Sequence, residues 1–236
     1  GYKVDSSYLF NWELRNIDFD CNGHAGAVGV VFPAAQGSLV ANVSVDATGA
    51  SAGFYGLPGR NWGAVNVEVD GGRYGIRTGG PAGGSVAGSS FFGARLVNQT
   101  VAAIECEDFV PLVMAGFQIE KAVAPAFEVK NNYSTYTAWN TMSLLDGSIE
   151  ITGGLADSAA IGNPGGKNLY LHNVYVGGAT SLVKSATRAP LTGSGPWSRI
   201  DEYSYTDQRT TAVGQPNLFT AWSMIDGVTN RNAERI

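Results

Sequence analysis

One short pattern recurs along the chain at intervals of about two dozen residues. Residues 14–20 (LRNIDFD), 40–46 (VANVSVD) and 64–70 (AVNVEVD) alternate apolar with polar positions and end in Asp, and their centres lie 26 and then 24 residues apart. Weaker copies follow at residues 88–92, 116–120, 147–152 and 172–177. Alternation of period two predicts β-strands rather than an amphipathic helix. Recurrence at a nearly constant period indicates a repeat architecture.

A second series of short apolar segments follows the first by about ten residues in each repeat. These segments lie at residues 27–32, 53–57, 74–78, 103–107, 126–130, 158–162 and 181–185. Because the two series keep step, each repeat is expected to be one coil with two strands, and each strand would pair with its equivalents in neighbouring coils. The sequence therefore predicts an all-β fold, a right-handed parallel β-helix of about seven coils over residues 1–186.

Stacking of the coils would place equivalent side chains directly above one another. One inward ladder is expected to contain Ile17, Val43, Val67, Phe117, Ile149 and Val174. The next ladder should contain Phe19, Val45, Val69, Phe91, Ile119, Ile151 and Val176. One outward column is expected to read Asp18, Ser44, Glu68, Ser90, Gln118, Glu150 and Tyr175. The other should read Asp20, Asp46, Asp70, Phe92, Glu120, Thr152 and Gly177.

The competing fold is an antiparallel β-sandwich, which also uses short strands and glycine-rich turns. It would separate paired strands by only about two to five residues, whereas matching segments here recur at the distance of a whole coil.

From about residue 187 the repeat pattern stops. Residues 187–236 are therefore expected to form an irregular C-terminal extension or cap that belongs to the same domain and covers an open sheet edge.

Composition agrees with a chain of many tight turns. Gly accounts for 32 of 236 residues, about twice its usual share of roughly 7%. The net charge of −5 gives no electrostatic reason to bind nucleic acid, and no apolar run is long enough to insert into a membrane. Cys21 and Cys106 have no metal-ligand spacing. The chain begins at Gly1 without Met or signal peptide, as expected of a processed or trimmed chain.

Several segments resemble a known family. The succession GAVGVVF (residues 26–32), LVANVSV (39–45), GFYGL (53–57) and GRYGIR (72–77) is similar to the pectate-lyase-like superfamily of β-helices, and most similar to the branch with glycoside hydrolase family 55, the exo-β-1,3-glucanases. This resemblance implies carbohydrate handling in a secreted or cell-surface protein. The family's glucanases carry two β-helix halves, so it also implies further domains of a longer parent chain.

Carboxylates form the densest polar group on the expected outer face. Asp46, Glu68 and Asp70 are the catalytic candidates, because carboxylates one coil apart would lie about 5 Å from each other, near the separation that retaining glycosidases use. An alternative is that Asp20, Asp46 and Asp70 hold Ca²⁺, which prefers oxygen ligands; no other cofactor is required. A further alternative is structural, because Asp before Gly commonly accepts backbone hydrogen bonds in a turn.

Substrate contacts are expected from basic and aromatic side chains. Arg73 and Arg77 would suit an acidic sugar beside calcium, although Arg77 could instead belong to a structural ladder with Glu105 and Glu128. Aromatic rings in loops can stack on the apolar face of a pyranose, or can simply cover the corners of the coils. The loop candidates are Trp62, Tyr133, Tyr136 and Trp139.

The sequence thus leaves two functions open. The first is an enzyme that cleaves an extracellular polysaccharide by hydrolysis or β-elimination. The second is a non-catalytic β-helix module of a fibre, adhesin or phage tailspike, which binds glycan or serves as a rigid spacer. Both have a polysaccharide or oligosaccharide as the partner, and fold alone does not choose between them.

Overall fold

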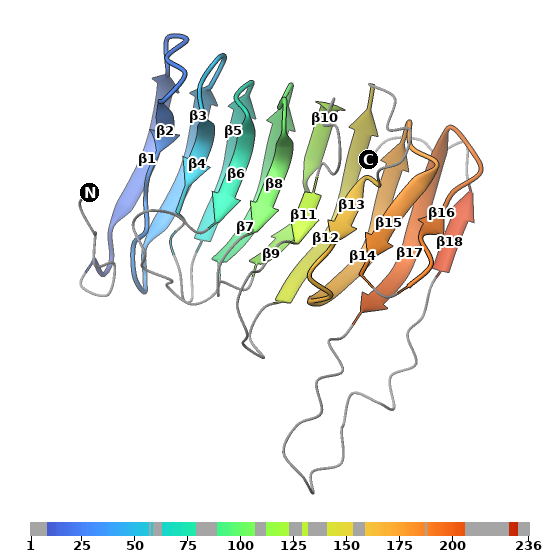
Figure 1. Cartoon of the computed structure of the whole chain (residues 1–236). Coiled ribbons are helices and arrows are strands. Elements are labelled where there is room, and N and C mark those ends of the chain that lie inside the picture. The colour runs from blue at the N-terminus through green and yellow to red at the C-terminus, as the bar shows by residue number, and fades with distance from the viewer. Residues whose placement is uncertain are drawn as a thin grey trace, which may run out of the picture.

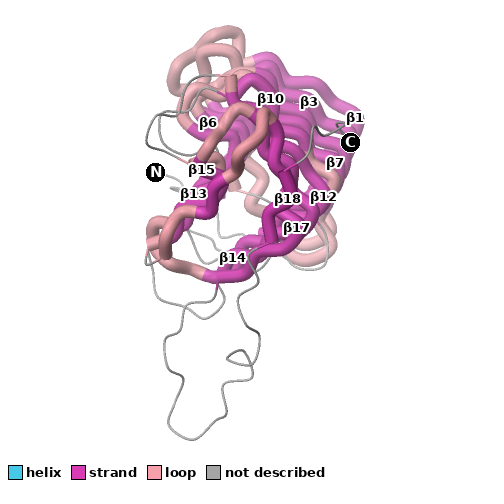
Figure 2. The backbone as a smooth tube through the Cα atoms, turned by 90° about the vertical axis from the view of Figure 1, so that its right-hand side faces the viewer, coloured by secondary structure: helices cyan, strands magenta, loops and turns pink. Residues whose placement is uncertain are grey.

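The computed structural model describes residues 9–56, 58, 63–78, 89–106, 112–122, 129–131, 141–152, 159–186, 188–205 and 227–230. These residues form strands and their connections, and none of them is helical. No helix able to cross a membrane is therefore found in this part of the chain. The strands stack one after another along a single axis (Figure 1). Seen from the end of the stack, the chain winds around a common interior (Figure 2).

The first sheet contains the strands of the more regular repeat. In spatial order these are β1 (Glu13–Asp20), β3 (Leu39–Asp46), β5 (Gly63–Asp70), β7 (Ser89–Val97), β10 (Gln118–Ala122), β12 (Thr141–Ile151) and β14 (Asn168–Gly177), all parallel. The short β9 (Leu112–Ala115) pairs with the first halves of β7 and β12. Together, β9 and β10 therefore take the place of one long strand.

The second sheet repeats the arrangement with shorter strands. Its parallel members are β2 (Val28–Val30), β4 (Ala52–Tyr55), β6 (Tyr74–Thr78), β8 (Ala102–Cys106), β11 (Val129–Asn131), β13 (Ile161–Asn163) and β15 (Ser181–Ser185). The predicted parallel β-helix is confirmed. The connection from the first sheet to the second is fully described in five of the strand pairs. The described residues thus trace about five turns, slightly fewer than the seven coils expected.

Apolar side chains from both sheets fill the interior and form one continuous core. Because strand residues alternate between faces, side chains at alternate positions enter this core, except at one bend in each first-sheet strand, where two consecutive residues stay outside. One inward ladder contains Ile17, Val43, Val67, Ala94, Phe117, Gly147 and Val174. The next contains Phe19, Val45, Val69, Leu96, Ile119, Ile149 and Val176. The core also holds the buried thiols of Cys21 and Cys106, which form no disulfide.

The fourth repeat is aligned differently from the sequence-based expectation. Phe91 was expected beside Val69, but Leu96 holds that place, and Phe91 lies earlier in β7, beside Ala64. The strand is nine residues long and bends at Gly93. Apolar residues occur at alternate positions both before and after Gly93. The segment before Gly93 therefore resembles the segment that follows the bend in the other repeats, and the sequence pattern was aligned on the wrong one.

The sixth repeat is also shifted. Ile149 was expected in the ladder with Phe117, but it stacks on Ile119 instead. Gly147 lies at the level of Phe117, where a side chain would collide with the ring: a Cβ at Gly147 would be 2.2 Å from Cε1 of Phe117. Ile151, expected beside Ile119, is displaced toward the end of β12. A search for alternating apolar residues does not detect a glycine at an inward position.

These two shifts change the outward columns as well. One column reads Asp18, Ser44, Glu68, Arg95, Gln118, Ser148 and Tyr175. The next begins with Asp20, Asp46, Asp70, Val97 and Glu120. Ser90 and Glu150 are therefore absent from the first column, and Arg95 takes the place beside Glu68.

The C-terminal part closes the stack with antiparallel strands. β16 (Leu191–Thr192) pairs with β15, β17 (Trp197–Tyr205) pairs with β14, and β18 (Gly227–Asn230) pairs with β17. Ile200 of β17 lies opposite Val174, and both side chains are fully buried. The last coil is thereby covered by a strand of the segment from which a cap was expected. Residues 187, 206–226 and 231–236 lie outside the described residues.

Candidate functional site

The chain of the first sheet bends at one left-handed residue in each coil. These residues are Asn16, Asn42, Asn66, Gly93, Gly116, Asp146 and Asn173, with φ between 50° and 70°. Gly, Asn and Asp are the residues that tolerate this conformation best. Where Asn occurs in successive coils, its side chains form a hydrogen-bonded ladder. Asn42 Nδ2 donates to Asn16 Oδ1 over 2.9 Å, and Asn66 Nδ2 donates to Asn42 Oδ1 over 2.9 Å.

Two glycines interrupt this ladder in the middle of the sheet. Gly93 and Gly116 have no side chain to place between Asn66 and Asp146. A Cβ at either glycine would find no atom outside its own chain neighbours closer than 3.8 Å. The missing side chains leave an open groove of ≈ 290 Å³ that runs across four coils. It is lined by Asn66, Val67, Glu68, Gly93, Ala94, Arg95, Gly116, Phe117, Gln118, Asp146, Gly147 and Ser148.

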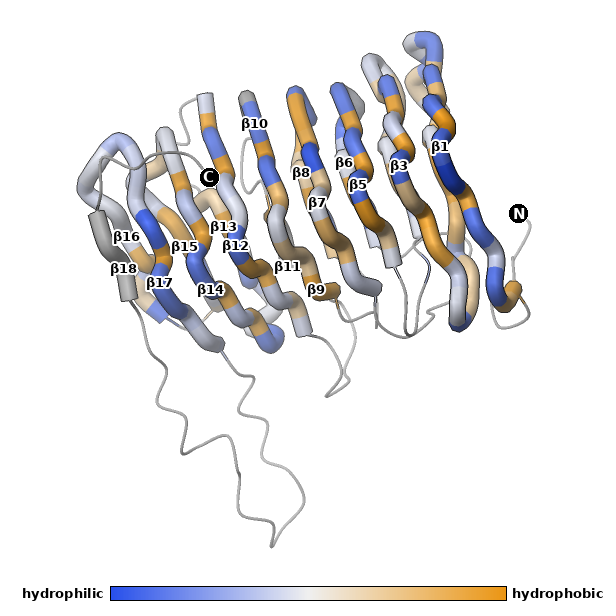
Figure 3. Tube along the Cα trace, turned by 180° about the vertical axis from the view of Figure 1, so that it is seen from behind, coloured by the Kyte–Doolittle hydropathy of each residue, from blue (hydrophilic) through white to orange (hydrophobic). Residues whose placement is uncertain are grey.

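Two outward columns of different character flank the bend. Hydrophilic and hydrophobic stretches follow one another along β1, β3 and β5, as Figure 3 shows. In the four coils of the groove, the residue before the bend belongs to an apolar column of Val65, Phe92, Ala115 and Leu145. Phe92 is 51% exposed and Val65 is 42% exposed, which is unusual for side chains of this size. On the opposite side lies the polar column of Glu68, Arg95, Gln118 and Ser148.

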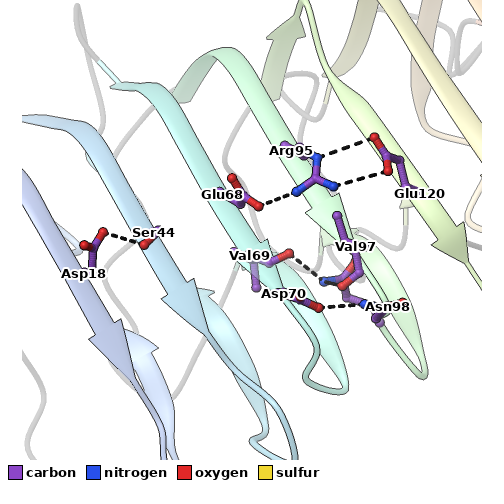
Figure 4. Close-up of polar contacts among 10 residues, drawn as sticks. Asp18, Ser44, Glu68, Val69, Asp70, Arg95, Val97, Asn98 and Glu120 are labelled. Carbon is purple, nitrogen blue, oxygen red and sulfur yellow. Dashed lines mark hydrogen bonds and ion pairs between the residues drawn. The ribbon is translucent and has the colours of Figure 1, made fainter. Parts of the chain in front are cut away.

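Arg95 is the central charge of the polar column (Figure 4). Its Nη1 forms an ion pair with Glu68, and its Nη2 lies 3.3 Å from Oε2 of Glu120. The hydrogen bond to Glu120 is the main reason why the pKa of Arg95 is raised. Because these side chains are partly exposed, solvent screens the pairs. Glu68 and Arg95 thus present both an acceptor and a donor in the groove.

The neighbouring acidic column has the expected register. Asp46 lies between Asp20 and Asp70, and all three side chains are on the outer face. Asp20 accepts a hydrogen bond from the backbone N–H of Asn22 over 2.6 Å. Asp46 accepts one from the backbone N–H of Thr48 over 3.0 Å. Asp20 and Asp46 thus accept backbone hydrogen bonds in turns, which is the structural role that the sequence analysis gave as an alternative to catalysis.

One carboxylate of this column, Asp46, is favoured in its ionised form. The hydrogen bond from Thr48 lowers the pKa of Asp46, whereas a general acid needs a raised pKa. Asp70 accepts a hydrogen bond from Asn98 Nδ2 over 2.7 Å (Figure 4). Among the described residues, no three His, Cys, Asp or Glu side chains gather closely enough to hold a metal ion. Catalysis by Asp46, Glu68 and Asp70 stays a prediction.

Neither of the two arginines predicted to contact substrate lines the groove. Arg77 is on β6 in the second sheet, with its guanidinium 5.6 Å from the ring centre of Tyr55 and 4.8 Å from that of Tyr74. Its Nε lies 3.6 Å from Oε2 of the buried Glu105. Arg73, exposed just before β6, lies 5.9 Å from the ring centre of Tyr74. The pairing of Arg77 with Glu105 in register agrees with the first step of the structural ladder that the sequence allowed.

One member of that expected ladder differs. Lys130, not Glu128, pairs in register with Glu105. Glu128 lies outside the described residues, as do all four aromatic candidates for sugar binding, Trp62, Tyr133, Tyr136 and Trp139.

Sequence reasoning missed Arg95, Phe92 and the glycine floor of the groove. A usable signal was nonetheless present. Each inward residue after the bend follows an Asn, Gly or Asp, as in Asn66-Val67, Gly93-Ala94 and Asp146-Gly147. Alignment on this residue, instead of on apolar alternation, places Arg95 beside Glu68.

Fold and site together define a parallel β-helix with an amphipathic groove on the outer face of one sheet. No protein-family model, no curated protein and no solved structure matches the chain.

Proposed function

We propose that this chain is a carbohydrate-binding β-helix domain of a secreted or surface protein, and that its groove seats a stretch of polysaccharide. The observation that carries this proposal is the pair of columns, one apolar and one polar, that follow the groove across four coils. A pyranose ring has C–H groups on its faces and hydroxyl groups around its rim. A repeating sugar chain along the solenoid axis would meet a repeated version of both surfaces.

The side chains match these two parts of a sugar. The exposed ring of Phe92 would stack on a C–H face and lose its costly contact with water. Carboxylates such as Glu68 accept hydrogen bonds from hydroxyl groups, and the Arg95 guanidinium donates them. The amide of Asn66 can do both. Charge-assisted hydrogen bonds of this kind are the stronger ones, and they would fix the orientation of the sugar.

Charge favours a neutral or amine-bearing polysaccharide. Glu68, Glu120 and Asp146 place three carboxylates in or beside the groove, and Arg95 is already paired with two of them. A polyanion such as a pectin or alginate chain would meet a net negative surface, where like charges repel.

Cleavage of the bound chain is a second candidate function. Glu68 is 46% exposed at its side chain and lines the groove, and Asp46 and Asp70 occupy adjacent positions in the next column. Hydrolysis by a pair of carboxylates, or β-elimination with calcium on the acidic column, would use these residues. The resemblance of the repeats to pectate-lyase-like β-helices is consistent with either reaction. Without cleavage, the same groove would suit a fibre, adhesin or tailspike module.

Binding can be tested with one substitution that fills the groove. Gly93→Asn continues the asparagine ladder at a left-handed position (φ 70°), and in four other coils Asn holds the same place in the bend with φ of 51–54°. The variant should therefore fold, while its side chain occupies the groove floor. We expect neutral glucans to bind the wild type in isothermal titration calorimetry, and Gly93→Asn to weaken this binding by at least ~10-fold, which is about 1.4 kcal/mol.

The matched control is Gly23→Asn, a left-handed glycine (φ 71°) whose added Cβ would meet nothing within 4 Å. It should bind like the wild type. Phe92→Ser should weaken binding as Gly93→Asn does, because it removes the stacking ring. If no neutral or amine-bearing polysaccharide binds, the proposal fails. If Gly93→Asn binds as well as Gly23→Asn, the groove is not the site.

Catalysis has a separate readout. Incubation with the bound polysaccharide should release reducing ends if the domain is a hydrolase, and ultraviolet-absorbing unsaturated ends if it is a lyase. Asp70→Asn and Glu68→Gln should each abolish that release, and Asp70→Asn should do so while binding persists, because Asp70 does not line the groove. Binding without release would identify the domain as non-catalytic.

A further inference from the structure

Among the described residues, no strand covers the outer edge of the first coil, whereas β17 covers that of the last coil. β1 is the end strand of the first sheet, and β3 is its partner among the described strands. Ile17 is 41% exposed, although its equivalents Val43 and Val174 are 2% and 0% exposed. Trp12, just before β1, is 53% exposed. Apolar side chains that enter the core elsewhere are therefore in contact with solvent at this end.

The other end of the stack shows how such an edge is closed in this protein. β17 runs antiparallel to β14 and places Ser198, Ile200, Tyr203 and Tyr205 against the inward residues of that strand. These four side chains are spaced by two, three and two residues, because β17 also follows the bend of the sheet. An antiparallel strand with this spacing is thus able to cover a bent parallel strand.

The first coil carries the same spacing. Leu14, Ile17 and Phe19 stack on inward residues of β3, and Trp12 lies two residues before Leu14, so these four positions are again separated by two, three and two residues. This pattern reads the same in both directions. A second β1 placed antiparallel on the first would therefore set Leu14 opposite Ile17 and Trp12 opposite Phe19. A two-fold axis normal to the sheet keeps inward residues on the inner side in both copies.

Charges on the outer side of β1 agree with this pairing. In the same register, Arg15 of one copy lies diagonally across from Asp18 of the other, within reach of a cross-strand ion pair. Arg15 already pairs with Glu13 of its own chain over 2.8 Å. It would therefore lie between Glu13 and Asp18, and would offset the repulsion between these two carboxylates across the interface.

We propose that two copies of this chain associate end to end through β1, as an isologous dimer in which the two β1 strands pair antiparallel and join the first sheets into one. The dimer interface buries the apolar edge of the first coil, in the same way that β17 buries the edge of the last coil. The unpaired backbone groups of an edge strand, which promote association with other strands, are satisfied in the same step.

Sedimentation equilibrium of the 236-residue chain over a range of concentrations tests this proposal. The wild type should fit a monomer–dimer equilibrium. Ile17→Asp places a carboxylate in the centre of the interface and should weaken the dimer by at least ~10-fold, since burial of an unpaired charge is costly. Val65→Asp is the matched control: Val65 is 42% exposed on the outer face of β5, away from the open end. It should leave the dimer unchanged.

A charge reversal tests the register itself. Arg15→Asp should weaken the dimer, and Arg15→Asp combined with Asp18→Arg should restore it. Circular dichroism would establish that all variants keep the β fold. The proposal is overturned if the wild type stays monomeric at every concentration, if Ile17→Asp dimerises like Val65→Asp, or if the second charge reversal fails to rescue the first.

Discussion

The ring of Phe117 occupies the space that a side chain of Gly147 would need. Its Cε1 lies 2.2 Å from the position of a Cβ at Gly147. They are adjacent in one inward ladder, in which most other members are Val or Ala. A large ring is accommodated because the next coil contributes no side chain. Interiors are packed too densely for both to be large.

Replacement of Gly147 by Ala should therefore destabilise the domain. Phe117 is 1% exposed and its ring would lie within 2.3 Å of the added Cβ, so we expect a loss of about 1–3 kcal/mol, typical of an overpacked core. Chemical denaturation monitored by fluorescence would measure it. Gly26→Ala is the control, because its added Cβ would meet nothing within 4 Å. It should be neutral or slightly stabilising, and equal effects at both glycines would contradict the packing argument.

The asparagine ladder should contribute to stability through both its backbone and its side chains. Asn42 has a φ of 53° and its amide bonds to Asn16 and Asn66. Asn42→Gly keeps the backbone conformation and loses only the two exposed side-chain bonds. Asn42→Ala also incurs the left-handed penalty of roughly 1–2 kcal/mol. Urea denaturation should rank stability as wild type, then Gly, then Ala; an Ala variant as stable as the Gly variant would disprove the role of φ.

Much of the fold could be predicted from the sequence because stacked coils convert a linear period into contact. The strands at residues 74–78 and 181–185 are found with the bounds expected for them, as β6 and β15. Asp46 and Asp70, 24 residues apart in sequence, are neighbours in register. Repetition of the same spacing in several coils fixed this register without knowledge of the side-chain packing.

The groove could not be predicted in the same way, because it is made by missing side chains. Apolar alternation has no means to detect that Gly147 is inward or that Gly93 marks a bend, since neither residue contributes a hydrophobic side chain. The two repeats that contain them were the two that were misaligned. Arg95 was lost with the fourth repeat, so its ion pair with Glu68 was not anticipated.

Acid should remove the stabilising contribution of Asp46. Its pKa is lowered from 3.8 in the folded chain by the hydrogen bond from Thr48, so the folded state binds the proton less readily than the unfolded state does. The contribution is complete above the unfolded pKa and is lost as the pH falls through the folded pKa. The stability difference between wild type and Asp46→Ala should therefore be constant near neutral pH and shrink below 3.8. Thermal unfolding across this range would measure it, and a difference that grows on acidification would be contrary to expectation.

Arg95 and Leu96, adjacent on β7, should respond oppositely to substitution because they face opposite sides of the sheet. Arg95 is 40% exposed at its side chain, so Arg95→Gln should change the free energy of unfolding by less than about 1 kcal/mol, as expected of screened ion pairs. Leu96 is fully buried between Val69 and Ile119, so Leu96→Ala should cost about 2–5 kcal/mol through lost packing and a cavity.

Denaturation and glycan binding measured on both variants separate a role in stability from a role in sugar binding. Arg95→Gln should keep stability and lose sugar affinity, since the groove then loses its charged donor. A strongly destabilised Arg95→Gln would instead identify Arg95 as part of the scaffold.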